Sequence, residues 1–183
     1  MFKLKISQDI IQHCQNQIQQ YNFGQRSTAN GTREQQFTGI VGQCAIMKLF
    51  GLDFINGADG CDDGEDINDK GLIVDVKTMG RTTDVRDYYV NNFIGLQLRF
   101  NTDIYIFCSL NKNTNELTVC GWIPKEEFMQ KADYFPKGSW RKRSDGSKFQ
   151  TFADLYEIKN SDLNDVQSYE ELLFQIDLKY NLK

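Results

Sequence analysis

The sequence contains few of the residues that build several common kinds of site. It has one histidine, His13, among 183 residues, so a zinc site rich in histidine or a histidine-based triad is hard to build. Its five cysteines include no C-x-x-C pair, and we interpret them as reduced, mostly buried thiols of a cytoplasmic protein. No apolar run approaches membrane-spanning length, and the N-terminus lacks the apolar region of a signal peptide. We therefore expect no membrane partner.

Linker-like segments are also missing, and only two prolines occur. Hydrophobic residues make up 40% of the chain and charged residues 25%, which is ordinary for a globular protein. We therefore expect a single domain over residues 1–183. The net charge of −4 does not draw the whole molecule to nucleic acid, but a local basic face on an acidic protein can still bind phosphates.

One charged stretch stands out, D-I-N-D-K-G-L-I-V-D-V-K-T, which runs from Asp66 to Thr78. A polar turn followed by a β-branched run predicts a hairpin that leads into a buried strand. Asp75 and Lys77 interrupt that strand two residues apart, so both side chains point to one face. A buried charge costs several kcal/mol unless it is paired or metal-bound. The two residues are therefore either a structural ion pair or a functional site.

A tight turn would place Asp66 on the neighbouring strand, on the same side as Asp75 and Lys77. Two carboxylates close together repel each other and favour a divalent cation between them. Oxygen ligands with room for water suit Mg²⁺ or Mn²⁺. The lysine could then orient a water molecule or stabilise charge on a phosphate.

An acid-rich segment, Asp59–Asp66, precedes this hairpin. Read as a calcium-binding EF-hand loop, it would have Cys61 at the third position and Lys70 at the twelfth, where oxygen ligands are required. We therefore reject a calcium loop and interpret most of these acids as solvated loop charges.

The second predicted helix, residues 32–50, has a capping box at Thr32 and contains Gly39 and Gly42. Glycines inside a helix are unfavourable, so we expect this helix to approach a sheet closely. Gln43 follows the second glycine, and it is either solvent-facing or part of a site. Other helices are predicted over residues 7–21, the latter part of 84–100, 124–132 and most of 161–183; strands are predicted over 53–56, 103–110, 116–123 and 150–159.

The only basic cluster is the segment K-G-S-W-R-K-R-S-D-G-S-K, residues 137–148. Such a run is either a solvated loop or a surface that contacts phosphates, with one aromatic side chain available to stack. The candidate nucleic-acid-binding residues are Lys137, Trp140, Arg141, Lys142, Arg143 and Lys148.

The order of these elements over residues 32–110 resembles the core of the PD-(D/E)XK nuclease superfamily. The resemblance rests on Asp66, on the run Asp75-Val76-Lys77 and on the following Thr78. It implies an α/β protein with a restriction-endonuclease-like αβββαβ core, in which helices flank a central mixed sheet. Residues 111–183 resemble the C-terminal β/α extension of phage- and restriction-related members.

Two positions depart from the superfamily pattern. The first acid follows Glu65 instead of proline, and the helix position that often carries glutamate holds Gln43. Glutamine can hold a metal-bound water molecule, but it lowers the negative charge of the site.

The resemblance implies a Mg²⁺-dependent endonuclease that hydrolyses phosphodiester bonds, with DNA favoured over RNA as substrate. Asp66 and Asp75 would bind the metal together with the Val76 carbonyl, Lys77 would position the attacking water, and Gln43 would assist. Cutting both strands of a duplex requires two sites, which favours a homodimer.

Two other interpretations compete. The chain could be a non-catalytic nucleic-acid-binding or protein-interaction module on the same scaffold, in which Asp75 and Lys77 form a structural ion pair. It could also be a metal-dependent phosphohydrolase of small molecules, but the sequence lacks the further His and Asp ligands that such sites usually show.

Overall fold

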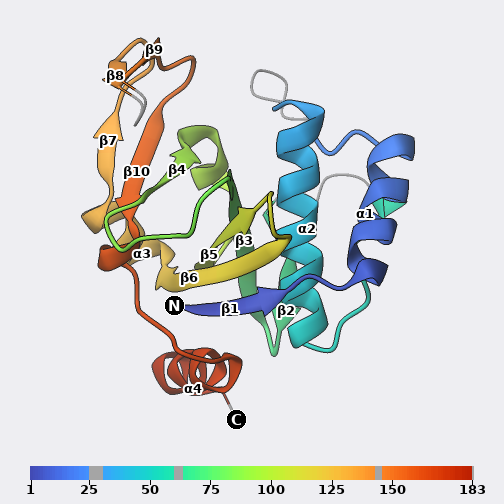
Figure 1. The fold of residues 1–183 in the computed structure, drawn as a ribbon. Helices are drawn as coiled ribbons and strands as arrows, with labels where there is room; N and C mark the ends of the chain where they lie inside the picture. The colour runs from blue at the N-terminus through green and yellow to red at the C-terminus, as the bar shows by residue number, and fades with distance from the viewer. Residues whose placement is uncertain (25–30, 60–63, 143–145, 183) are drawn as a thin grey trace.

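A curved, five-stranded mixed sheet forms the centre of the molecule (Figure 1). The structure is a computed structural model that describes residues 1–24, 31–59, 64–142 and 146–182. The strands follow the order β1-β6-β5-β3-β2, and only β3 and β5 run parallel. Their bounds are β1 Phe2–Lys5, β2 Ile67–Asp69, β3 Leu72–Arg81, β5 Ile104–Asn111 and β6 Glu116–Pro124.

Two helices, α1 (Gln8–Gln20) and α2 (Arg33–Leu49), cover one face of this sheet. The capping box predicted at Thr32 is present, because its side chain accepts from the Gln35 amide while the Gln35 side chain accepts from the Thr32 amide. The helix stops before Gly51, whose φ of +69° suits glycine. The apolar stripe of α2 packs against Val74, Val76 and the even-numbered residues of β5.

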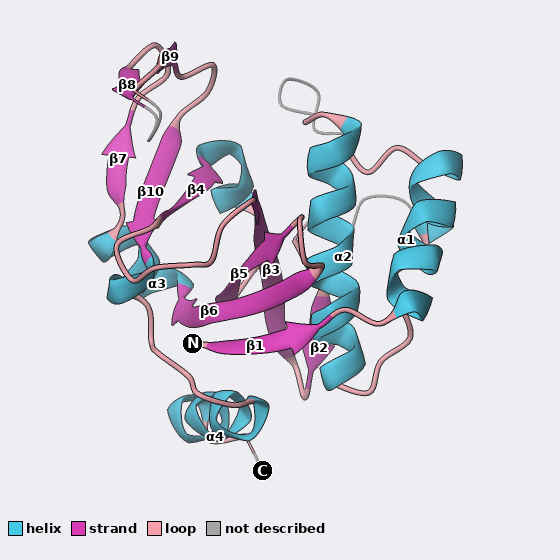
Figure 2. Ribbon diagram, viewed as in Figure 1, coloured by secondary structure: helices cyan, strands magenta, loops and turns pink. Residues whose placement is uncertain are grey.

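The opposite face of the sheet supports a second, aromatic core. Tyr105 and Phe107 of β5 point to this side and pack with Phe93, Phe128 and Ile158. These partners belong to β4 (Val90–Ile94), α3 (Lys125–Lys131) and β10 (Leu155–Lys159). A small sheet of order β4-β10-β7 and a ribbon of two strands form a lobe beyond this core; their remaining strands are β7 Asp133–Phe135, β8 Trp140–Lys142 and β9 Lys148–Gln150 (Figure 2).

Helix α4 (Tyr169–Tyr180) lies at the opposite end of the molecule from the β8–β9 ribbon (Figure 1). Its Leu172 and Ile176 are buried in the α1–α2 core. The short helix after Pro124 and the strands β5 and β6 are confirmed. In the described ranges, no helix has the combination of length and apolar character that crossing a bilayer requires.

The helix predicted in the latter part of residues 84–100 is wrong. This segment forms strand β4 followed by a 3-10 turn, Gly95–Arg99. Asn91 and Phe93 are buried two residues apart because β4 pairs with β10, and tertiary pairing here overrides local propensity. The crossover between parallel strands β3 and β5 therefore carries a strand where the αβββαβ order has a helix.

Two predicted strands also differ. Residues 53–56 are irregular, and Phe54 and Ile55 instead pack as single side chains against the α1–α2 core. The Ile55 carbonyl lies 2.8 Å from Nε2 of His13, so the single histidine of the chain has a backbone hydrogen-bond partner. The strand predicted over residues 150–159 is divided into β9 and β10 by an irregular segment at 151–154.

The described cysteines are free thiols, as predicted; they are Cys14, Cys44, Cys108 and Cys120, and all four are buried. Burial raises the pKa of the Cys120 thiol to about 12. Cys61 lies outside the described residues.

Candidate active site

The candidate site lies where strand β3 extends beyond the end of its shorter neighbour β2. Strand β2 pairs only with Leu72–Val74, whereas β5 accompanies β3 from Val74 to Arg81. In the part of the chain that the structure describes, no strand pairs with residues 75–81 on the β2 side. The carbonyls of Ile73 and Arg81 accept amide hydrogens on the β5 side, so the alternate residues Val76, Thr78 and Gly80 turn their backbone groups to the open edge.

Asp66 reaches this open edge from the residue just before β2. The predicted hairpin forms, with a two-residue turn at Lys70 and Gly71, whose φ values are +51° and +86°. The Val76 amide donates to Oδ2 of Asp66 over 2.6 Å. The hairpin thus brings the Asp66 carboxylate to the level of the D-V-K run, and its oxygen lies against the strand backbone.

The buried Asp75 and the half-buried Lys77 form an ion pair on the aromatic-core face of β3. Nζ of Lys77 lies 2.5 Å from Oδ1 of Asp75, and the side chains are 15% and 2% exposed. The ammonium group lies 5.6 Å from the centre of the Phe93 ring. Burial, with a contribution from the nearby Asp75 charge, raises the pKa of the Tyr105 phenol above its usual value. The shared face of Asp75 and Lys77 is as the two-residue spacing predicted.

Helix α2 meets β3 from the other face, through a glycine. A Cβ at Gly42 would lie 1.9 Å from Oγ1 of Thr78, so only glycine allows this approach. The close approach expected for the helix glycines is therefore confirmed at Gly42. At Gly39 a Cβ would meet nothing within 4 Å.

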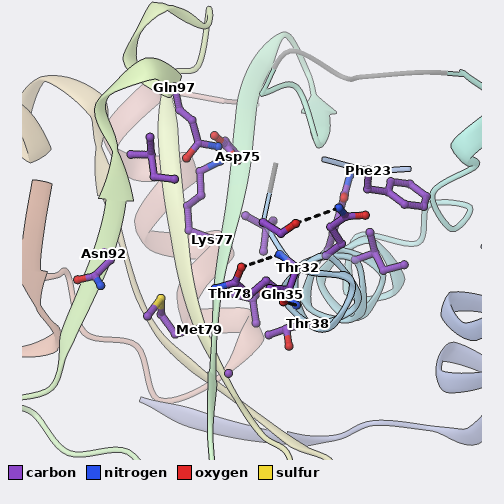
Figure 3. A pocket seen from close by; sticks show the side chains of 18 of the residues that line it. Phe23, Thr32, Gln35, Thr38, Asp75, Lys77, Thr78, Met79, Asn92 and Gln97 are labelled. Atoms are coloured by element: carbon purple, nitrogen blue, oxygen red, sulfur yellow. Dashed lines mark hydrogen bonds and ion pairs between the residues drawn. The ribbon is translucent and has the colours of Figure 1, made fainter. Parts of the chain in front are cut away.

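Gln43 is buried beside Gly42 and borders the candidate site from the helix side. Figure 3 shows Asp75, Lys77 and Gln97 on one side of β3, and Thr78 with the residues of α2 on the other. The open edge of the strand allows one cavity to reach both sides. Gln43 thus shares a cavity with the Asp75–Lys77 pair while it belongs to the opposite face of the sheet.

This cavity has a volume of about 690 Å³. Its walls combine the four predicted site residues with polar side chains of β4, the 3-10 turn and α2, and with aromatic rings of the lobe. Among the lining residues are Gln43, Asp66, Asp75, Lys77, Thr38, Asn92, Gln97, Phe149 and Phe152. Sequence reasoning missed the last five, although two phenylalanines beside the basic cluster were a signal for the aromatic wall.

Residues of the basic cluster form the β8–β9 ribbon, and their side chains point to its two faces. Arg141 turns toward β10, where Nε and Nη2 donate to the two oxygens of Glu157 over 3.1 and 2.5 Å. Its guanidinium also lies 3.7 Å from the centre of the Phe135 ring. Arg141 is thus engaged in a structural clamp, which does not favour the phosphate contact predicted for it.

Four of the remaining candidates of the cluster are exposed: Lys137, Trp140, Lys142 and Lys148. Register places Lys142 opposite Lys148, and Trp140 shares their face of the ribbon, since Arg141 and Phe149 occupy the alternate positions. Lys137 is exposed just before β8. Arg143 lies outside the described residues.

The donor set of the predicted metal site consists of oxygen atoms. Asp66 and Asp75 offer carboxylates, and the Val76 carbonyl turns to the edge that Asp66 occupies. Mg²⁺ is commonly held by one or two carboxylates and keeps several waters, so the chemistry of these donors fits the ion. Within the described ranges, no group of three or more His, Cys, Asp or Glu side chains is placed to hold a metal.

No protein-family model, curated protein or solved structure matches this chain. The resemblance to PD-(D/E)XK nucleases therefore stays a prediction from Asp66 and the D-V-K run. The geometry of the β3 edge is the basis for assigning a function.

Proposed function

We propose that this protein is a Mg²⁺-dependent endonuclease that hydrolyses phosphodiester bonds, in DNA rather than RNA. The observation that carries the proposal is the buried Lys77–Asp75 pair, 2.5 Å apart, beside Asp66 at an open strand edge that borders a cavity. Burying charge costs several kcal/mol of desolvation, and a charged pair beside a cavity that also holds a second carboxylate is a candidate functional site.

Asp66 and Asp75 would hold Mg²⁺ or Mn²⁺, together with the carbonyl of Val76. The bound ion would lower the pKa of water and stabilise charge that develops on the phosphate. The carboxylates of the chain supply the negative charge that attracts the ion. Because Gln43 replaces a carboxylate, we expect one metal ion to bind more firmly than a second.

Lys77 would act through the position of its ammonium group. A lysine is a compact charge on a flexible stem, so Nζ can turn from Asp75 to a water molecule or a phosphate oxygen in the cavity. The amide of Gln43 would hold water from the helix side. Phe93 and Tyr105 exclude bulk solvent behind the pair and so strengthen its electrostatic effect.

A second candidate is a non-catalytic binding module for nucleic acid or protein. The observation that favours it is the direct contact between Lys77 Nζ and Asp75 Oδ1, which a purely structural ion pair would also show. Under this interpretation the pair fixes β3 against the aromatic core, and the lobe alone carries the function.

Cleavage assays with purified protein separate the two candidates. Single-stranded, double-stranded and branched substrates are incubated with Mg²⁺, Mn²⁺ or a chelator. We expect metal-dependent cleavage that Asp75→Asn and Lys77→Met each lower by at least about a hundredfold. Asp177→Asn is the matched control, because it removes a carboxylate from the exposed pair with Lys70. Undiminished cleavage by Asp75→Asn would contradict the assignment.

A Mn²⁺ titration gives a readout that does not depend on turnover. Loss of Mn²⁺ binding in Asp66→Ala would support the metal site. No binding of Mn²⁺ by the wild type at millimolar concentration would support the structural ion pair.

A further inference from the structure

Within the lobe, the segment of residues 133–159 differs in charge from the rest of the chain. It holds six of the 21 Lys and Arg residues but only four of the 25 Asp and Glu residues. The lobe is therefore net positive on a protein that is net acidic elsewhere. A local positive surface of this kind attracts a polyanion and leaves the rest of the molecule to repel it.

Exposed aromatic rings accompany these cations. Trp140, Phe152 and Tyr134 are 68%, 62% and 49% exposed. Phe152 also lines the cavity, next to the half-buried Phe149. A large aromatic ring left in water beside a cavity offers a flat surface to a ligand with a π-face.

Two lysines of the ribbon are arranged at a cost to the fold. Lys142 and Lys148 face each other across β8 and β9, and like charges directly opposite destabilise a strand pair. In the described part of the chain neither forms an ion pair, whereas Arg141, which precedes Lys142 on β8, is clamped to Glu157. The clamp holds the ribbon in place, and the lysines keep their charge available.

We propose that the cavity and the lobe bind single-stranded nucleic acid. An unstacked base would stack on Phe152 at the cavity, and the same strand would continue around the β8–β9 ribbon to Lys142 and Lys148, which lie on the ribbon face opposite the cavity-lining Phe149. In a duplex each base is covered by its neighbours, so an aromatic wall inside a cavity meets no free base face; in a single strand it does. This inference rests on the proposed function and names the form of its substrate.

Binding assays without catalysis test the inference. Fluorescence anisotropy is measured in a chelator with labelled single-stranded DNA, single-stranded RNA and duplex DNA of about ten nucleotides or base pairs per strand. We expect both single strands to bind more tightly than the duplex. Phe152→Ala should weaken single-strand binding about tenfold, and Phe152→Tyr should retain it, since base stacking on an aromatic ring is worth about 1–3 kcal/mol.

Phe174→Ala is the matched control. Phe174 is 66% exposed on α4, which lies away from the lobe, so its loss should leave binding unchanged. Duplex binding as tight as single-strand binding, or equal affinities of Phe152→Ala and wild type, would overturn the inference. Single-strand binding that depends on Phe152 without any cleavage would support it while contradicting the nuclease. Duplex cleavage that ignores Phe152 would do the reverse.

Discussion

Two ion pairs of similar length, Lys77–Asp75 and Arg141–Glu157, hold their cations in different surroundings. Lys77 and Asp75 lie on one strand of the central sheet, and the lysine borders the cavity. Arg141 and Glu157 lie on two strands of the lobe, where the guanidinium meets both carboxylate oxygens and covers the Phe135 ring. The shortest contact is 2.5 Å in each pair.

The difference shows that distance alone does not identify a functional pair. The guanidinium of Arg141 is fixed by its planar fork and by stacking, both of which make it a structural fastener. Lys77 offers a point charge on a flexible stem beside an open cavity, with a second carboxylate, Asp66, at the strand edge. The surroundings of the cation, more than the pair itself, separate chemistry from structure.

The largest expected effect comes from breaking the buried pair on one side. Asp75→Ala leaves the half-buried Lys77 without its carboxylate, and the cavity beside it admits some solvent, so we expect the free energy of unfolding to fall by about 2–3 kcal/mol. Chemical denaturation followed by circular dichroism measures the change. The double variant Asp75→Ala with Lys77→Met should recover most of the loss, because it removes both charges. A double variant no more stable than the single one would contradict a purely electrostatic cause.

A smaller effect tests the close approach of α2 to the site strand. Gly42→Ala places a methyl group into Thr78, and we expect a loss of about 1–3 kcal/mol from overpacking. Gly39→Ala is the matched control in the same helix; its methyl group meets nothing, so it should raise stability by about 0.5–1 kcal/mol. Equal effects of the two substitutions in thermal or chemical unfolding would show that the contact with Thr78 is unimportant.

The smallest effect distinguishes cations that serve binding from the one that serves structure. Lys142→Ala with Lys148→Ala should lower the slope of log affinity against log salt by roughly 1.4 for a single strand, because two phosphate contacts are lost. Arg141→Ala should leave this slope unchanged and instead lower the free energy of unfolding by about 1–2 kcal/mol, through loss of the contacts with Glu157. A slope that falls with Arg141 but not with the lysines would reverse the comparison.

The hairpin and the D-V-K strand could be predicted from sequence because their signals are local. Three signals are each confined to a few neighbouring positions. They are the turn residues of the hairpin, the two-residue spacing of Asp75 and Lys77, and the capping box at Thr32. The position of Gly42 inside a helix also predicted a close packing partner, although the sequence could not show that the partner is Thr78.

The failures share a different cause, which is pairing between distant segments. Strand β4 was expected to be helical because its partner, β10, follows more than sixty residues later and leaves no mark on the local pattern. The partner of Arg141 is likewise invisible from the basic run itself. The aromatic wall of the cavity, with Phe149 and Phe152, forms only once the lobe folds over the sheet.

The pairing of β4 with β10 also means that one wall of the candidate site depends on a late segment of the chain. Strand β4 covers the Asp75–Lys77 face of the sheet through Phe93, yet it gains its own partner only when residues 155–159 have been made. Synthesis runs from the N-terminus, so strands β3, β5 and β6 are made before residues 155–159. Until then the aromatic core lacks Ile158 of β10. A growing chain thus contains Asp66, Asp75 and Lys77 before it contains Phe149 and Phe152, which complete the wall of the cavity.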